Sequence, residues 1–133
     1  MYKSLLVLLM ALVLFGCGPE KIQLSNTKIN EYKFLEEMYN DSYFPNHLVD
    51  KGRNILLKLC LSIEKEKPST TEDVYILTRK ATIEFNELAN EFGNANSEIE
   101  TAARENIARD IGFILNAYNY EFNIESAIST REW

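Results

Sequence analysis

Residues 97–118 carry an apolar pattern with helical spacing, and this stretch constrains the fold more than any other part of the chain. Its apolar residues recur at intervals of three and four, which places them on one face of a helix. They are Ile99, Ala103, Ile107, Ile111, Ile114, Leu115 and Tyr118. Ser97 followed by Glu100 has the spacing of a capping box, so we expect the helix to begin at Ser97. The pattern predicts a long helix with one buried face.

The same spacing predicts three more long helices and one short helix. The expected helices are 28–39, 45 to about 67, 70 or 71 to about 92, and 124–130, separated by turn-forming residues at 40–42, 68–70, 93–96 and 119–123. Gly93 is expected to be a left-handed C-cap. No Asn-Gly or Asp-Gly hairpin signal competes with the helical spacing. Because the connections are short, the sequence predicts an all-α fold, a small antiparallel bundle of four main helices plus a short C-terminal helix.

The first 18 residues have the pattern of a bacterial lipoprotein leader. Lys3 supplies a positive charge, and residues 5–15 are an apolar run too short to span a bilayer but suited to a signal peptide. Leu14-Phe15-Gly16-Cys17 resembles the lipobox, whose cysteine is acylated and becomes the first residue, although Phe15 is bulkier than usual. We expect residues 1–16 to be a lipoprotein signal peptide, 17–27 a lipidated Cys17 with its tether, and 28–133 the helical domain. The alternatives are an uncleaved anchor and an ordinary secretory leader.

The expected lipid and the charge of the chain limit its location and partners. Acyl chains on Cys17, such as palmitate, would hold the domain at a bacterial membrane, in the periplasm or at the cell surface. Gly18 stands where an Asp would resemble an inner-membrane retention signal, which favours the outer membrane. The whole chain has 14 basic and 20 acidic residues. Removal of the leader removes Lys3, so the mature chain would have a net charge of 13 − 20 = −7. An acidic body does not suit nucleic acid, whose phosphates need cationic contacts.

Several polar residues fall where a bundle normally buries apolar side chains. Asp110 lies inside the apolar arc of the 97–118 helix, with Asn106 one turn before it. Glu100 and Arg104 are spaced as an ion pair. Since buried carboxylates need partners, one interpretation is that these residues satisfy loop backbones and helix ends. The other is a polar pocket or a set of partner contacts, formed by Asp41, Tyr43, Asp50, Glu98, Glu100, Arg104 and Asp110.

The sequence lacks the usual patterns of catalytic and metal sites. His47 is the only histidine and has no Glu-x-x-His motif of a di-metal bundle. There is no G-x-S-x-G motif and no Gly-rich phosphate loop. If Cys17 is acylated, Cys60 has no disulfide partner, and its apolar surroundings predict a buried, inert thiol. We therefore assign no catalytic residue, metal ligand or cofactor from the sequence.

Ile76 and Ile83 are apolar residues on the polar side of their helix. They are seven residues apart and fall among Arg79, Lys80 and Glu87, away from the main apolar face. One interpretation is that they pack under the tether or the C-terminal segment. The alternative is a docking patch for another protein.

From about Tyr32 to Trp133 the chain resembles an uncharacterised bacterial domain family of unknown function. The stretches that carry the resemblance are EYKFLEEMYNDSYFPNHLVDKGRNIL, NSEIETAARENIARD and the terminal AISTREW. The resemblance implies a compact helical domain, but it supplies no activity, substrate or cofactor. Members commonly start near the first helix without a leader, so the lipobox is a departure that argues against transferring a cytoplasmic role.

Two hypotheses for function follow from these features. The first is a lipid-anchored helical module of the bacterial envelope that binds an unknown protein, for example as an immunity-like or envelope-accessory protein. The second is a carboxylate-based metal-binding or hydrolytic protein, which requires at least three of the acidic residues to converge in a pocket. A third possibility is a structural component of the envelope with no discrete site.

Overall fold

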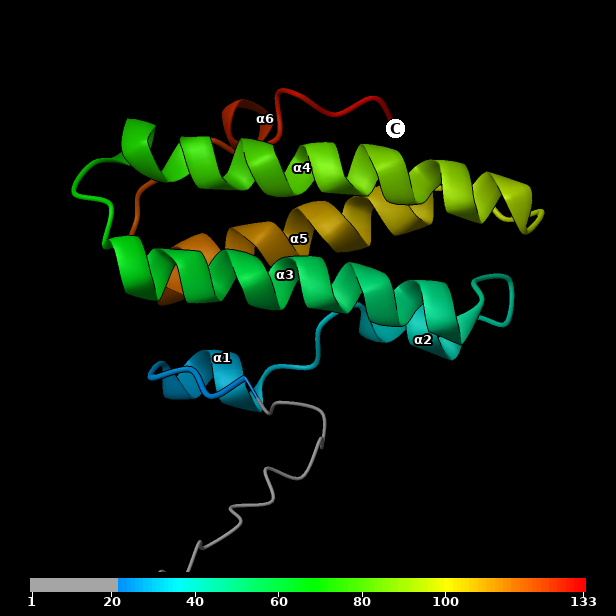
Figure 1. The fold of residues 1–133 in the computed structure, drawn as a ribbon, viewed down its shortest axis with the longest axis horizontal. Coiled ribbons are helices and arrows are strands. Elements are labelled where there is room, and N and C mark those ends of the chain that lie inside the picture. Colours follow the sequence, from blue (N-terminus) through cyan, green and yellow to red (C-terminus); the bar gives the residue numbers. More distant parts are fainter. Residues whose placement is uncertain (1–21) are drawn as a thin grey trace, which may run out of the picture.

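The computed structural model describes residues 22–133, which form helices joined by short loops (Figure 1). The helices are α1 Thr27–Glu31, α2 Glu36–Asn40, α3 Asn46–Glu66, α4 Thr71–Asn94, α5 Thr101–Ala117 and α6 Ile124–Ala127. No strand occurs in this part of the chain, so the predicted all-α class is confirmed. The expected signal peptide and Cys17 lie outside the described residues.

The three long helices form an antiparallel bundle, as the short connections predicted. Figure 1 shows α3 and α4 side by side, running in opposite directions, with α5 behind them and antiparallel to α4. The short helices α1 and α2 pack on α5, and α2 also packs on α3, so together they occupy the position of the fourth expected helix. The C-terminal α6 packs on α4 and α5. The side of α3 and α4 that faces away from α5 is therefore the least covered part of the bundle.

The core consists of the apolar faces of these helices. Among its largest fully buried side chains are Leu56 of α3, Phe85 and Phe92 of α4, and Ile107, Ile111 and Ile114 of α5. Each helix contributes residues at intervals of three and four, which is the spacing seen in the sequence. Gly52 allows α3 to approach its neighbours, because a Cβ atom there would lie 2.9 Å from Leu35 Cδ1 and 3.2 Å from Phe85 Cε1.

The start of α5 differs from the predicted capping box. The helix begins at Thr101, and its N-cap Glu100 makes no side-chain capping bond. Ser97 is instead fully buried in the connection from α4, where its backbone N–H donates to the carbonyl of Phe92 at 2.9 Å. The left-handed residue of this turn is Asn96, with φ of 56°, while Gly93 remains inside α4. The predictions that Ser97 caps α5 and that Gly93 is the left-handed C-cap of α4 are therefore both wrong.

The predicted first helix is divided into two. Helix α1 ends at Glu31 and α2 begins at Glu36, with Leu35 in the left-handed conformation at φ of 57°. A leucine rarely adopts positive φ, because its Cβ then crowds the backbone. Contacts from another element must therefore hold this break in place, and they come from α5.

Candidate functional site

Asp110 of α5 is buried and holds the break between α1 and α2. Its side chain is only 1% exposed. Its Oδ1 accepts from the Tyr32 hydroxyl at 2.7 Å, and its Oδ2 accepts from the Leu35 backbone N–H at 2.6 Å. Burial raises the pKa of the Asp110 carboxyl, although the Leu35 and Tyr32 hydrogen bonds oppose that shift. Desolvation and the bond to Asp110 raise the pKa of Tyr32 to about 12.

Asn106, one turn before Asp110, acts on the same short helix. Its Oδ1 accepts from the backbone N–H of Met38 at 3.3 Å. Helix α2 has no capping side chain of its own, because its N-cap is Leu35. The first-turn N–H groups that a helix leaves without internal partners are thus met partly by side chains from α5. Asp110 and Asn106 thus satisfy a loop backbone and a helix end, in agreement with the first of the two interpretations for these two residues.

The other candidate carboxylates have separate partners. Asp50 accepts from the Tyr39 hydroxyl at 2.6 Å, and Asp41 accepts from the Tyr43 backbone N–H at 2.9 Å in a turn of its own loop. The Tyr43 hydroxyl in turn accepts from the Glu98 backbone N–H at 2.9 Å, which ties the loop before α3 to the loop before α5.

Glu98 and Glu100 lie close together in the loop before α5. The hydrogen bond and like charge of Glu100 raise the pKa of Glu98. Arg104 forms no ion pair with Glu100 in the described chain, contrary to the prediction, and its Nε is buried without a hydrogen-bond partner. Across residues 22–133, no three His, Cys, Asp or Glu side chains are placed to hold one metal ion. Within residues 22–133, the candidate carboxylates Asp41, Asp50 and Asp110 thus each have a different hydrogen-bond partner.

Cys60 is a free thiol in the core. It is fully buried, and desolvation raises its pKa to about 12. Because the thiolate is the reactive form, such a thiol is inert at neutral pH. The structure agrees with the interpretation of Cys60 as a packing residue.

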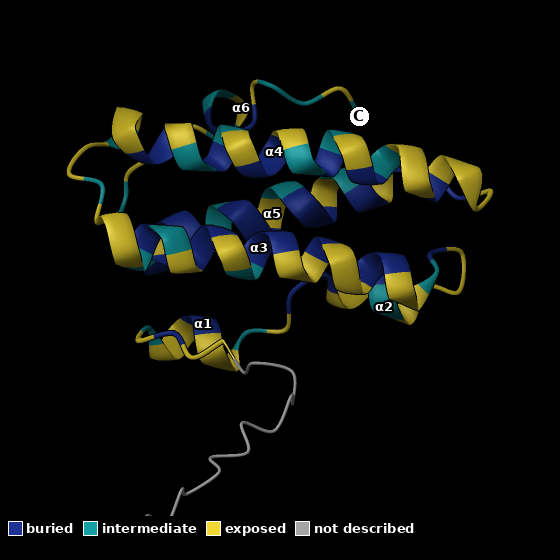
Figure 2. Cartoon of the chain, in the orientation of Figure 1, coloured by how far each residue is buried: buried dark blue, intermediate teal, exposed yellow. Residues whose placement is uncertain are grey.

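Ile76 and Ile83 lie on the surface, with exposed fractions of 66% and 47%. Their exposure contradicts the interpretation that they pack under the C-terminal segment or under the described part of the tether. The C-terminal segment follows another side of α4, where Thr78 donates to the carbonyl of Ala127 at 2.7 Å and Asn86 to that of Thr130 at 2.9 Å. Leu61 of α3 is also exposed, at 43%. We call these three exposed residues of α3 and α4, Leu61, Ile76 and Ile83, the α3–α4 face. Figure 2 shows exposed stretches along both helices.

A family model described as "Family of unknown function (DUF5713)" matches residues 28–133. The chain belongs to this family. The match confirms the resemblance and includes nearly all of the described helices. No curated protein and no solved structure matches the chain. The family's description assigns no activity, so function must be argued from the surfaces of the domain.

One surface of this family domain could not be found from spacing in the sequence. An apolar hollow of about 650 Å³ lies on α5, where it is lined by Tyr32, Phe113, Phe122 and Ile124 among others. The rings of Tyr32 and Phe113 stack with centroids 3.8 Å apart. Gly112 leaves room for Phe122, since a Cβ atom there would lie 3.3 Å from its ring. The lining comes from three separate segments, each apolar only in part, so no single stretch signals it.

Glu64 is the second feature that sequence analysis missed. Its carboxylate accepts from the Ser25 backbone N–H at 2.7 Å, the Ser25 hydroxyl at 2.8 Å and the Tyr118 hydroxyl. The neighbouring Asn26 side chain donates to the carbonyl of Ala117 at 2.9 Å. The start of the described chain is thereby fixed to the C-terminal ends of α3 and α5. Glu64 begins the alternating Glu64-Lys65-Glu66-Lys67 stretch, and such a charge pattern by itself indicates a solvated helix end.

Proposed function

We propose that the protein is a lipid-anchored helical module of the bacterial envelope that binds another protein through the α3–α4 face. It would be held at a membrane, preferably the outer membrane, by acyl chains on Cys17. An immunity-like protein, which neutralises a toxin by binding it, is one form that such a module takes.

The observation that carries this proposal is the exposure of three large aliphatic side chains on the adjacent helices α3 and α4. Leu61, Ile76 and Ile83 are 43%, 66% and 47% exposed. Single exposed apolar residues are normal on soluble proteins, but several large ones on two adjacent helices are typical of an interaction site. Since no other described element covers them, a partner protein would remove their apolar surface from water.

The membrane part of the proposal depends on the sequence and on the length of the tether. Ser25 is bound to Glu64, so eight residues of sequence separate Cys17 from the point where the domain holds the chain. Eight residues reach at most about 28 Å when fully extended. An acylated Cys17 would hold the domain close to the bilayer. No helix in residues 22–133 is long and apolar enough to cross a membrane.

The anchor is tested by the intact mass of the full-length protein extracted from membranes of its native host. We expect loss of residues 1–16 together with the added mass of acyl chains at Cys17. Cys17→Ser should move the protein from the membrane to the soluble fraction. A native protein that retains Met1 and is found in the soluble fraction would contradict the proposed anchor.

The partner is tested in the same cells with a photo-crosslinking residue at position 76 or 83. The matched control position is Glu125, on the surface of α6. We expect cross-linked protein species from positions 76 and 83 and not from 125. If all three positions give the same pattern, or none, the α3–α4 face is not a docking surface.

A further inference from the structure

The α5 hollow lies on the side of α5 that faces away from the core. Five residues of α5 line it, all partly or fully exposed: Ala108, Arg109, Gly112, Phe113 and Asn116. On a helical wheel they occupy an arc opposite the buried residues of α5, such as Ile107, Ile111 and Ile114. Tyr32, Phe122 and Ile124 complete the lining. Helix α5 therefore has apolar residues on two sides, one packed in the core and one that residues 22–133 leave open to solvent.

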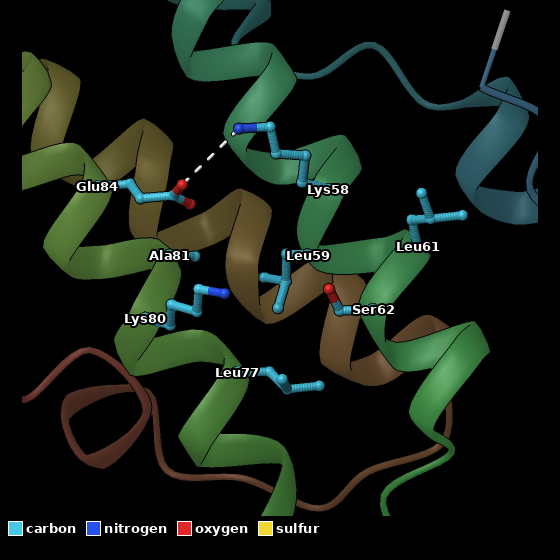
Figure 3. A pocket seen from close by; sticks show the side chains of 8 residues that line it. All are labelled: Lys58, Leu59, Leu61, Ser62, Leu77, Lys80, Ala81 and Glu84. Atoms are coloured by element: carbon cyan, nitrogen blue, oxygen red, sulfur yellow. Dashed lines mark ion pairs between the residues drawn. The ribbon is translucent and has the colours of Figure 1, made fainter.

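The α5 hollow contains less charge than the other described hollows. The hollow between α3 and α4 is lined by Lys58, Lys80 and Glu84, and Figure 3 shows Lys58 paired with Glu84, at 3.8 Å. Two further hollows each contain both acidic and basic side chains. In the α5 hollow only Arg109 is charged, and it pairs with Glu37. Removing this surface from water would therefore leave few charged groups without solvent.

The aromatic rings of the hollow present apolar surface outward. The Tyr32 hydroxyl donates to Asp110 at 2.7 Å, toward the core, while its ring stacks on Phe113. Phe122 packs against Gly112 and is still 37% exposed. Aromatic side chains on a protein surface are typical of contact with the interfacial region of a bilayer.

The chain that leads to Cys17 leaves the domain beside this hollow. The Asn26 side chain donates to the carbonyl of Ala117 at 2.9 Å, and Ala117 follows Asn116, which lines the hollow. The α5 part of the hollow, residues 108–116, is about 12 Å long. The tether of eight residues reaches at most about 28 Å. An acylated Cys17 would therefore hold the bilayer near this side of the bundle.

We propose that the α5 hollow rests on the phospholipid bilayer that carries the Cys17 anchor, with Phe113, Phe122 and Ile124 in contact with lipid acyl chains. This inference rests on the proposed function, because the anchor brings the hollow to the bilayer. So small an apolar contact would not hold a free domain, but a short tether gives it a high effective concentration of lipid. Helices α3 and α4, which Figure 1 shows in front of α5, then face away from the bilayer and remain accessible to a partner protein.

The charges around the hollow favour an apolar contact over an electrostatic one. Glu121 and Glu125 are exposed neighbours of Phe122 and Ile124 in the sequence. Their carboxylates repel anionic lipid, so zwitterionic lipid suits the contact better. The end of α3, at the same end of the bundle, is charged at residues 64–67 and offers no comparable apolar surface.

The test uses the full-length protein, extracted from membranes of its native host and reconstituted into vesicles of phosphatidylethanolamine with a minor share of phosphatidylglycerol. An aromatic photo-crosslinking residue is placed at position 122, and the matched control is position 87, an exposed residue of α4. We expect mass spectrometry to find about tenfold more phospholipid adducts from 122 than from 87, because only the hollow contacts lipid. High salt should leave the yield from 122 unchanged, since salt screens charges and not apolar contacts.

Substitutions test whether the apolar rings make the contact. With the photo-crosslinking residue at position 124, Phe122→Ser should lower the yield of phospholipid adducts about tenfold, because it removes an exposed ring from the hollow. Phe122→Leu keeps an apolar side chain and should retain most of the yield. Ile83→Ser removes an exposed apolar side chain from α4 and should retain all of it. Equal yields for Phe122→Ser and Ile83→Ser would overturn the inference.

The same mass spectra report the acyl chains on Cys17, so the inference and the anchor fail separately. An acylated protein with equal phospholipid adducts from 122 and 87 would overturn the inference and leave the anchor and the α3–α4 face intact. Adducts from 122 to the acyl chains on Cys17, to residues 1–21 or to a second copy of this chain would overturn it as well, because the hollow would then have another occupant. A native protein without acyl chains would remove the anchor, and the inference with it.

Discussion

The side-chain Oδ2 of Asp110 accepts a hydrogen bond from the backbone N–H of Leu35 at 2.6 Å, across 75 positions of sequence. Leu35 is the residue with positive φ that separates α1 from α2. The bond therefore fixes a backbone conformation that leucine does not favour. Through Asp110, the position of α5 determines where the N-terminal helices divide and how they cover the bundle.

Replacement of Asp110 by alanine should destabilise the fold strongly. Asp110→Ala would leave the Leu35 N–H and the Tyr32 hydroxyl without partners, and each buried unsatisfied group costs about 1–3 kcal/mol. We expect the free energy of unfolding in urea to fall by about 2–5 kcal/mol. Asp110→Asn keeps an acceptor for Leu35 and can donate to the Tyr32 oxygen, so it should cost much less. Equal losses for the two variants would show that these hydrogen bonds do not stabilise the fold.

The same carboxyl should make stability depend on pH. Its pKa in the folded protein is raised above the ordinary value of 3.8, mainly by burial. Between these two values the unfolded chain has released its proton and the folded protein has not, so stability falls as pH rises through this window. Asp110→Asn removes that effect. The difference in unfolding free energy, wild type minus Asp110→Asn, should decrease as pH rises above the ordinary carboxyl value of 3.8 and become constant once pH exceeds the raised folded value. A difference that increases with pH would contradict the raised pKa.

The sequence predicted those features that depend on repeated local spacing. The ranges of α3 and α4 agree with it closely, because their apolar residues keep the helical period over many turns. Asp110 was recognised as a buried carboxylate in need of partners, and the structure supplies them. The identity of the partners could not be predicted, since Tyr32 and Leu35 lie in a segment that itself has the pattern of a continuous helix.

The predicted start of α5 was wrong for a related reason. A capping box is defined by two residues, Ser97 and Glu100, and such a short signal is easily overridden by packing. Here the fully buried Ser97 belongs to the turn after α4. The α5 hollow was missed because its residues meet only in the folded chain. The exposure of Ile76 and Ile83 was an open alternative in the sequence, and only the placement of the C-terminal segment decided it.

Loss of the Glu64 carboxylate should loosen the start of the domain. Partial burial by itself raises the pKa of Glu64, but hydrogen bonds from Tyr118 and Ser25 outweigh it and hold the pKa below its usual value. The stabilisation from this group is therefore present above about pH 4.5 and is lost as pH falls through the lowered folded value. Glu64→Gln should increase the rate of tryptic cleavage after Lys28 at neutral pH. Because Glu64 is partly exposed, the loss of global stability should be small.

The control for this experiment is Glu66→Gln. Glu66 is exposed near the end of the same helix and makes none of the contacts described for Glu64. Its substitution should leave cleavage after Lys28 at the wild-type rate. Equal acceleration by both variants would mean that charge near the end of α3, and not the bonds to Ser25, controls protease access.

Gly52 and Gly93 should respond in opposite ways to alanine. Both lie inside helices, where alanine is intrinsically preferred by about 1 kcal/mol. A Cβ atom at Gly93 meets nothing within 4 Å, so Gly93→Ala should raise the unfolding temperature. A Cβ atom at Gly52 lies 2.9 Å from Leu35 Cδ1, and such overpacking typically costs about 1–3 kcal/mol. Gly52→Ala should therefore lower the unfolding temperature. A stabilising Gly52→Ala would mean that Leu35 moves aside readily, which its constrained backbone argues against.

Ile76 and Ile83 should be dispensable for folding. At 66% and 47% exposure they lose little apolar contact with water on folding, so Ile76→Ser and Ile83→Ser should change the free energy of unfolding by less than about 0.5 kcal/mol each. Ile107→Ser, at a fully buried position of α5, is the contrasting variant and should cost several kcal/mol. Urea unfolding of the three variants measures this difference. A large loss for Ile76→Ser or Ile83→Ser would mean that these side chains support the fold, and the argument that their apolar surface serves a partner would fail.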